Sequence, residues 1–180
     1  MSEDRSSERS RGWWERFTQS LRGNVEDQEG LLELIREASE REIIDAESAR
    51  MIDGIFRIGE MTVRDVMIPR AQMEVIEIDR PVSEVISRVV ELGHSRYPVV
   101  GDDRDDVRGI LLAKDLLRAC QQGSAPTIEE LLRPATYIPD SKHLDHLLYE
   151  FRTGRHHMAL AVDEYGGVAG LITIEDVLEI

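Results

Sequence analysis

Thr173 and Asp176 stand where a predicted strand passes into a helix, within the segment Gly170-Leu-Ile-Thr-Ile-Glu-Asp176. A hydroxyl and free backbone N–H groups at a helix start suit a phosphate, and a carboxylate one turn later can accept hydrogen bonds from vicinal ribose hydroxyls. The pattern Thr-x-x-Asp is also typical of a capping box, in which both side chains only close the helix. The segment alone supports the two interpretations equally.

A second group of polar residues precedes each of two predicted hairpins. His94-Ser-Arg-Tyr97 and Arg155-His-His-Met158 occupy matching positions in the chain. Cationic and hydrogen-bonding side chains there would supply the counter-charge that phosphates need. The alternative is that they are solvated groups that merely lead into buried strands.

These positions match because the chain repeats itself at an offset of 61 residues, so that Gly109 falls on Gly170 and Asp115 on Asp176. The segments that end in Pro69 and Pro134 also recur. The first copy has Leu112 where the second has Thr173, yet it keeps Asp115. An aspartate that persists without its capping partner favours the interpretation as a ligand-facing residue.

Each copy is predicted to fold as β-α-β-β-α, which makes an α+β protein with two repeats in a pseudo-two-fold arrangement. Alternation and helical periodicity predict a short strand, an amphipathic helix, a hairpin and a second helix in each copy. In the first copy these are 74–78, 82–92, 97–100 with 107–111, and a helix from Lys114; in the second they are 136–138, 144–151, 158–162 with 168–172, and a helix from Ile174.

Helices are also predicted before the repeats. We divide the chain into a flexible arm (1–28), a helical lead-in (29–60), a first domain (61–122) and a second domain (123–180). Within the arm, Trp13, Trp14, Phe17 and Leu21 have helical spacing. They indicate either a helix that docks on a membrane or partner, or a short helix packed on its own domain. Because the last predicted helix has no closing signal, we expect a piece of a longer protein whose next domain is missing.

The composition and the motifs narrow the classes of function that the protein could have. The 180 residues carry a net charge of −14, which disfavours nucleic acid as a partner, and the single cysteine fits a reducing cytosol. No catalytic motif is present, so we expect a binding module rather than an enzyme. We expect no metal site, because the His143 and His146 pair lacks further ligands and the aspartates of the 101–106 loop lack a fixed cage.

The doubled unit resembles a pair of cystathionine-β-synthase (CBS) domains, a Bateman module. The resemblance is closest to the CorC magnesium and cobalt efflux family and runs from about residue 29 to the end. It is carried by six motifs: Asp65-Val-Met-Ile-Pro-Arg70, His94-Ser-Arg-Tyr-Pro98, Ala113-Lys-Asp115, His157-Met-Ala159, Asp163-Glu-Tyr-Gly-Gly167 and Thr173-Ile-Glu-Asp-Val-Leu178.

The resemblance implies that an adenine nucleotide (AMP, ADP or ATP, the last with Mg²⁺) binds in the cleft between the repeats. Carried over, one site combines Ile68, Pro69, Met73, Ser95, Arg96, Tyr97, Thr173 and Asp176. A possible second nucleotide site combines Lys114, Asp115, His156, His157 and Met158, where Leu112 departs from the usual Ser or Thr. The resemblance also implies a homodimer, a membrane transporter as partner, and a cytoplasmic location at or near the inner face of the cell membrane.

We therefore expect a regulatory module whose nucleotide occupancy changes the arrangement of repeats or subunits and so influences magnesium and cobalt efflux. One alternative is a ligand-free dimerisation scaffold in which Thr173 and Asp176 only cap a helix. The other is a direct divalent-cation sensor that uses the acidic loops. Binding and thermal stability measurements separate the three.

Overall fold

The computed structural model describes residues 27–121, 127–154 and 156–180, so Trp13, Trp14, Phe17, Leu21 and the rest of the predicted arm up to residue 26 lie outside it. The chain divides into two compact units at the boundary between Phe56 and Arg57. We describe each unit by itself. In the described residues no helix is both long and apolar enough to cross a membrane.

The first unit is a pair of helices, α2 (Gln28–Glu40) and α3, which starts at Ala46 and continues to Glu60. Asp27 caps α2 by accepting a hydrogen bond from the N–H of Gly30 at 2.9 Å. An ion pair between Arg36 and Asp53, with an N–O distance of 3.3 Å, joins the two helices. Both helices are strongly amphipathic, yet neither has a fully buried residue.

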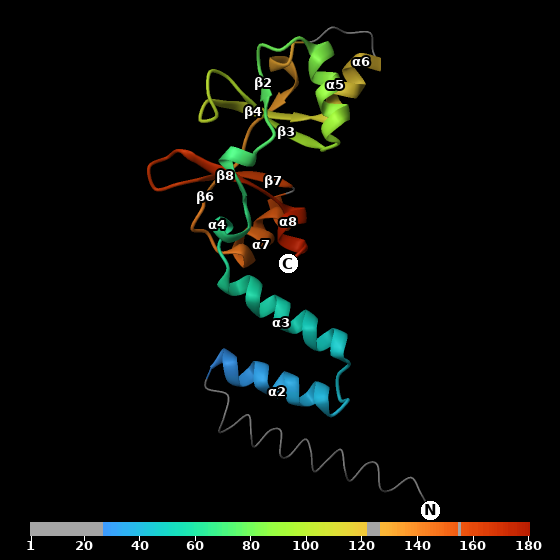
Figure 1. Ribbon diagram of the computed structural model, residues 1–180, viewed down its shortest axis with the longest axis vertical. Coiled ribbons are helices and arrows are strands. Elements are labelled where there is room, and N and C mark those ends of the chain that lie inside the picture. Colours follow the sequence, from blue (N-terminus) through green and yellow to red (C-terminus); the bar gives the residue numbers. More distant parts are fainter. Residues whose placement is uncertain (1–26, 122–126, 155) are drawn as a thin grey trace, which may run out of the picture. The chain divides into compact units, whose positions relative to one another are not determined.

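The second unit holds the repeats, each of which contributes most of a four-stranded sheet (Figure 1). The first sheet has the order β2-β3-β4-β5 and the second the order β1-β8-β7-β6. The first consists of β2 (Ile76–Glu77), β3 (Arg96–Val100), β4 (Val107–Leu112) and β5 (Leu132–Arg133). The second consists of β1 (Ile68–Pro69), β8 (Val168–Thr173), β7 (Met158–Val162) and β6 (Tyr137–Pro139).

Helices follow the strands in the same order in both repeats, which confirms the predicted α+β fold. They are α5 (Val82–Leu92) and α6 (Ala113–Gln121) in the first repeat, and α7 (Leu144–Gly154) and α8 (Ile174–Leu178) in the second. The short α4 (Val63–Val66) precedes both repeats, and two 3₁₀ turns, Arg70–Gln72 and Glu129–Leu131, follow β1 and precede β5. Gly93, with a φ of 73°, closes α5 in the left-handed conformation that glycine adopts without strain.

The repeats exchange the strands that lead into them. The strand β1 precedes the first repeat but pairs antiparallel with β8 of the second, while β5 precedes the second repeat and pairs with β4 of the first. The buried Asp140 reinforces this exchange, because Arg64 donates to its carboxylate at 2.8 Å. Each sheet is therefore completed by the short segment that leads into the other repeat.

Three apolar clusters stabilise the second unit. One packs α5 and α6 against the first sheet around Val85 and Leu116, and one packs α7 and α8 against the second sheet around Leu147 and Val177. The third, centred on Leu160 and Leu171, includes Met73 and is bordered by Val107 of the first sheet. The two sheets therefore share a core, and their relative position is set by packing as well as by the chain connection.

Candidate functional site

A cavity of about 430 Å³ lies where the two repeats meet. Five basic side chains line it, and they come from both repeats and the segment that joins them: Arg96, Lys114, Arg133, His156 and His157. Ile110, Leu112, Pro134 and Met158 give it apolar surface. The cavity thus offers cations for phosphates and apolar groups for a ring, and its volume lies in the range of small-molecule sites.

Strand ends position the basic groups. Arg96 opens β3 and pairs with Leu112 at the end of β4, and Lys114 lies in the first turn of the helix that follows. His156 and His157 directly precede β7. Arg133 belongs to the exchanged strand β5. The register of the two sheets therefore brings together residues that are up to 61 positions apart in the sequence.

Asp115 contacts this cavity through an ion pair. The guanidinium of Arg133 donates to its carboxylate at 2.7 and 3.0 Å, and Arg118 donates to it at 3.2 Å. The side chain of Asp115 is only 13% exposed, whereas that of Arg133 is 54% exposed. The carboxylate that would meet a ribose in the first repeat already has two cationic partners.

Of the five residues predicted for a second nucleotide site, the structure places Lys114, His156, His157 and Met158 around this one cavity. Arg96, which the sequence assigned to the other site, lines the same cavity. Arg133, Pro134 and Thr136 also line this cavity and were not predicted as site residues. The match of Pro134 with Pro69 in the repeated lead-in segment is the signal that would have indicated this segment.

The other predicted site is distributed over both sheets. Ile68 and Pro69 lie in β1, which pairs with β8, and Thr173 ends β8. Thr173 and Asp176 form the reciprocal capping box: the Asp176 carboxylate accepts from the Thr173 N–H at 2.7 Å and from its hydroxyl at 2.8 Å, while the Asp176 N–H donates to that hydroxyl at 3.3 Å. These side chains close α8, which the capping interpretation expected.

Three residues of that site differ in accessibility. Ser95 is exposed at the start of the first hairpin and lines a second cavity, of about 510 Å³, between α5 and α6. The Tyr97 side chain is fully buried, and its hydroxyl accepts from the His94 N–H at 2.8 Å and donates to the Val89 carbonyl at 3.1 Å. Burial raises the pKa of this phenol. Met73 is 2% exposed in the core shared by the sheets. Because their side chains are buried, Tyr97 and Met73 can contact a ligand only through their backbone atoms.

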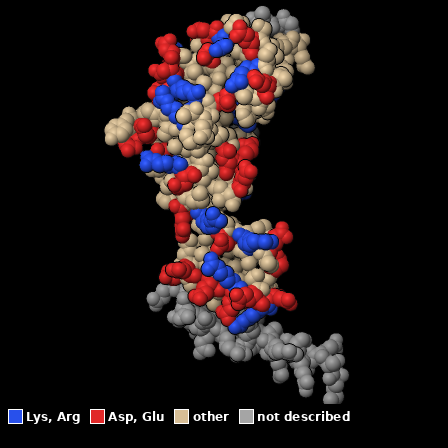
Figure 2. Space-filling view, viewed as in Figure 1, with Lys and Arg blue, Asp and Glu red and all other residues tan. Residues whose placement is uncertain are grey.

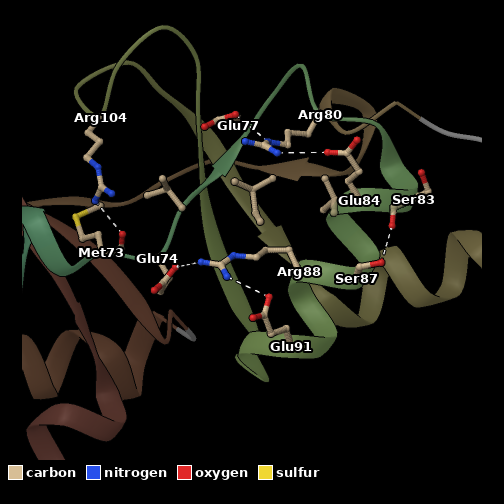
Figure 3. A pocket seen from close by; sticks show the side chains of 13 residues that line it. Met73, Glu74, Glu77, Arg80, Ser83, Glu84, Ser87, Arg88, Glu91 and Arg104 are labelled. Atoms are coloured by element: carbon tan, nitrogen blue, oxygen red, sulfur yellow. Dashed lines mark hydrogen bonds and ion pairs between the residues drawn. The ribbon is translucent and has the colours of Figure 1, made fainter.

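A larger cavity is a groove of about 770 Å³ along β2 and α5 (Figure 3). Two of its three arginines are neutralised within the groove: Arg88 donates to Glu74 at 2.7 Å and to Glu91 at 3.1 Å, and Arg80 contacts Glu77 and Glu84. The third, Arg104, donates to backbone carbonyls, and the four glutamates of the groove outnumber the three arginines. This groove has no surplus of positive charge. The smaller cavity between the repeats therefore is the better candidate for an anionic ligand.

The acidic loops are occupied by the protein's own cations. Asp105 accepts hydrogen bonds from Arg70 and from the Val168 N–H, and Asp106 forms an ion pair with Arg108 at 2.7 Å. The described residues contain no group of three or more His, Cys, Asp or Glu side chains that could hold a metal ion. On the face shown in Figure 2, acidic and basic side chains lie interspersed.

The sequence model of the CBS domain matches residues 63–122 and again 128–180, which together cover most of the chain. This chain belongs to the CBS-domain family. Residues 23–58 match a further family, described as the N-terminal region of NMB0537. The tandem match and the relatives below identify a CBS-domain pair of the CorC kind, as the sequence motifs predicted.

Relatives of this CBS pair include the magnesium and cobalt efflux protein CorC of Vibrio cholerae, 45% identical over 185 residues that cover 99% of this chain and 63% of the relative. The protein of the same name from Escherichia coli (strain K12) is 41% identical over 91% of this chain and 56% of its own length. The chain thus spans a little over half of the length of these curated relatives.

Two solved structures have the same fold. A conserved domain of unknown function from Neisseria meningitidis is 41% identical, with a TM-score of 0.77, and the alignment covers 83% of this chain and 97% of that one. The CBS domain of the bacterial CNNM/CorC family Mg²⁺ transporter in complex with ATP is 36% identical, with a TM-score of 0.69 and coverage of 74% and 95%. The ATP belongs to that protein.

Proposed function

We propose that this CBS pair binds an adenine nucleotide between its repeats and acts as a regulatory module in magnesium and cobalt efflux. The observation that carries the proposal is the cavity between the repeats, with Arg96, Lys114, Arg133, His156 and His157 on its wall in a chain of net charge −14. Guanidinium and imidazole groups are suited to phosphate oxygens. The ATP complex of a related CBS domain supports this choice of ligand.

The two halves of the cleft are proposed to differ in what they hold. Asp115 is paired with Arg133 and has Leu112 before it, so the first-repeat side offers cations to phosphates but no free carboxylate to a ribose. Asp176 is held only by the Thr173 cap, which a ribose hydroxyl can replace at small cost. We therefore assign the nucleoside to Ile68, Pro69, Thr173 and Asp176, and the phosphates to the basic cavity.

A nucleotide would act as a signal only if it binds two arrangements of the repeats with different affinity. Contacts across the repeats that such a change would alter are present. Arg70 binds Asp105 and donates to the Val168 carbonyl at 3.4 Å, and Arg104 donates to the carbonyls of Arg70 and Met73 at 2.6 and 2.8 Å. These groups connect the first hairpin loop to the second sheet.

The test is calorimetric titration of the chain with AMP, ADP and ATP, each with and without Mg²⁺. We expect saturable binding that Asp176→Ala abolishes. Arg96→Ala should weaken ATP binding about tenfold, which is roughly 1.4 kcal/mol, and AMP binding less, because it removes a phosphate partner. Arg88→Ala is the matched control, since this arginine is paired in the groove beside β2. Absence of binding to the folded wild type would favour the scaffold alternative.

A homodimer is part of the proposal. Leu117 on α6 and Leu178 on α8 occupy the same position in the two repeats, and they are 54% and 65% exposed. Val90 and Tyr149 add apolar surface on the neighbouring helices. Sedimentation of the wild type as a dimer, and of Leu117→Glu as a folded monomer, is the expected result; a monomeric wild type at micromolar concentration would contradict it.

A further inference from the structure

Two adjacent histidines lie among the permanent cations of the cavity between the repeats. Besides Arg96, Lys114 and Arg133, the wall of this cavity holds His156 and His157. Histidine is the side chain whose charge ordinarily changes between pH 5 and 8, whereas arginine and lysine stay charged throughout that range. One part of the positive charge available to a phosphate is therefore fixed, and another part depends on the pH.

The backbone holds both imidazoles where the two halves of the proposed nucleotide site meet. The His157 carbonyl accepts a hydrogen bond from the Ile174 N–H at 3.2 Å, which places His157 beside the residue that follows Thr173. The ring of His156 lies against the end of α7, because a Cβ at Gly154 would be 2.9 Å from its Cδ2 atom. Both histidines are exposed, so they can exchange protons with water.

The charged side chains that share the cavity with these imidazoles are cationic. Arg96 comes from β3, Lys114 from α6 and Arg133 from β5. The nearby carboxylate of Asp115 is already bound by Arg133 at 2.7 Å and by Arg118 at 3.2 Å. Like charges disfavour the protonated form of a histidine. Without an anion in the cavity, the neighbouring cations therefore oppose protonation of both imidazoles.

The two helices that flank the histidines add charges of both signs. Arg152 lies in the last turn of α7, whose C-terminal end favours a cation through the helix dipole. Glu175 and Asp176 lie in the first turn of α8, and the Asp176 carboxylate accepts two hydrogen bonds from Thr173. Since these contributions oppose one another, the arrival of the phosphates is the main change in the electrostatic field at the histidines.

We propose that nucleotide binding is coupled to protonation of His156 and His157, an inference that rests on the proposed function of this site. Phosphate oxygens favour the imidazolium form, so the anion draws protons onto the histidines and each proton strengthens binding. Thermodynamic linkage limits the gain to about tenfold in affinity per pH unit for each proton taken up. The CBS pair then responds to pH and to nucleotide together, and it binds its ligand more strongly as the pH falls.

The test is calorimetric titration of the chain with ATP and Mg²⁺ at about pH 6.5, 7.2 and 8.0, each in two buffers with different enthalpies of ionisation. The difference between the buffers gives the number of protons taken up or released on binding. We expect net uptake at about pH 7.2, and an affinity about threefold to tenfold higher at pH 6.5 than at pH 8.0. A phosphate group titrates near pH 6, so a site that only selects the ionised phosphate would release protons instead.

Glutamine variants identify the groups that take up the protons. His156→Gln and His157→Gln keep a hydrogen-bond donor that cannot be protonated in this range. Each should reduce the uptake, and the double variant should abolish it together with the rise in affinity at pH 6.5. His146→Gln is the matched control, because it makes the same change at an exposed histidine of α7 that does not line the cavity. It should retain the wild-type uptake.

The outcomes separate this inference from the proposed function. ATP binding with the same affinity at all three pH values and without proton uptake would overturn the coupling and leave the nucleotide function standing. This measurement uses the wild type alone, so it does not depend on the folding of a variant. Uptake that persists in a folded double variant would also overturn the coupling, since another group then takes the protons. Absence of ATP binding at every pH would contradict the proposed function and the coupling with it.

Discussion

At the level of single residues, the aspartates at matching positions of the two repeats have different partners. Asp176 caps α8 with Thr173, whereas Asp115 binds Arg133 of the exchanged strand β5. The persistence of Asp115 without a capping threonine favoured a ligand-facing role from the sequence alone. The ion pair with Arg133 gives this persistence a structural explanation, so the persistence of Asp115 is no longer an argument for the nucleotide proposal, which rests on the basic cavity.

The contact that Asp105 makes between the repeats should stabilise the fold in a pH-dependent way. Its hydrogen bond from Arg70, and next that from the Val168 N–H, lower the pKa of this carboxyl. A lowered folded-state pKa contributes stability above the unfolded value of about 3.9, and this contribution is lost as the pH falls through the lower folded value. We expect Asp105→Asn to lower the free energy of unfolding at pH 6, and we expect its difference from the wild type to shrink as the pH falls below about 3.9.

Urea denaturation at a series of pH values measures this difference. Asp102→Asn is the control, because Asp102 lies in the same loop but interacts electrostatically with Arg108 and not with Arg70. A difference between wild type and Asp105→Asn that is as large at pH 2 to 3 as at pH 6 would show that the charge of Asp105 does not make the contact.

Some residues of the site could be predicted because they belong to a repeated or recognisable motif, and others could not. Lys114, His156, His157 and Met158 were grouped through the resemblance and the repeat, and the structure places them around one cavity. Arg133 could not be recognised in this way, because the matching residue in the first lead-in segment is the apolar Ile68. Tyr97 was selected for its position in a motif, which carries no information about the direction of its side chain.

At the level of elements, periodicity located the long ones well. The helix predicted over residues 82–92 is α5, and both hairpins agree with the structure to within one residue at each end. The strands β1 and β5 were not predicted. Each has only two residues, too few for any alternation to be detected, and each pairs with a strand far away in the sequence.

Glycine recurs at matching positions of β4 (Gly109) and β8 (Gly170), and close contact with an exchanged strand explains why. A Cβ at Gly170 would overlap the carbonyl oxygen of Ile68, and a Cβ at Gly109 would lie 2.7 Å from that of Arg133. Each glycine therefore lets the exchanged strand approach. We expect Gly170→Ala to lower the free energy of unfolding by about 1–3 kcal/mol, because the backbone must move to relieve the overlap.

Thermal and urea unfolding test this effect against Gly54→Ala in the interior of α3, where no atom lies within 4 Å of the added methyl group. The control should be neutral or stabilising by up to about 1 kcal/mol, as alanine is the better helix former. Equal effects of the two substitutions would show that the approach of β1 does not require glycine.

At the level of the whole molecule, the exchange of β1 and β5 predicts that the two repeats unfold together. Val63 precedes the first repeat but is fully buried in the cluster of the second sheet. Val63→Ala should therefore destabilise both sheets equally, by about 2 kcal/mol. Native-state hydrogen exchange should show this at Leu160 in β7 and at Val99 in β3 alike.

The control is Ile55→Ala, which truncates an aliphatic side chain that is 67% exposed on α3. It should leave the exchange of both amides unchanged. Loss of protection at Leu160 while Val99 keeps its wild-type rate would mean that the repeats are separate cooperative units, and a ligand between them could then order one without the other.

The pairing of β1 with β8 also sets a waiting time during translation. Ile68 leaves the ribosome roughly 100 residues before its partner Leu171, which at the usual rates of synthesis is about 5–20 s. Through that interval the first sheet can form completely, because β5 also precedes β8 in the chain, but β1 and its adjacent apolar residues have no strand to join. The nascent chain therefore carries an open edge until its last strand emerges, and this is the period in which a chaperone or a neighbouring nascent chain would meet it.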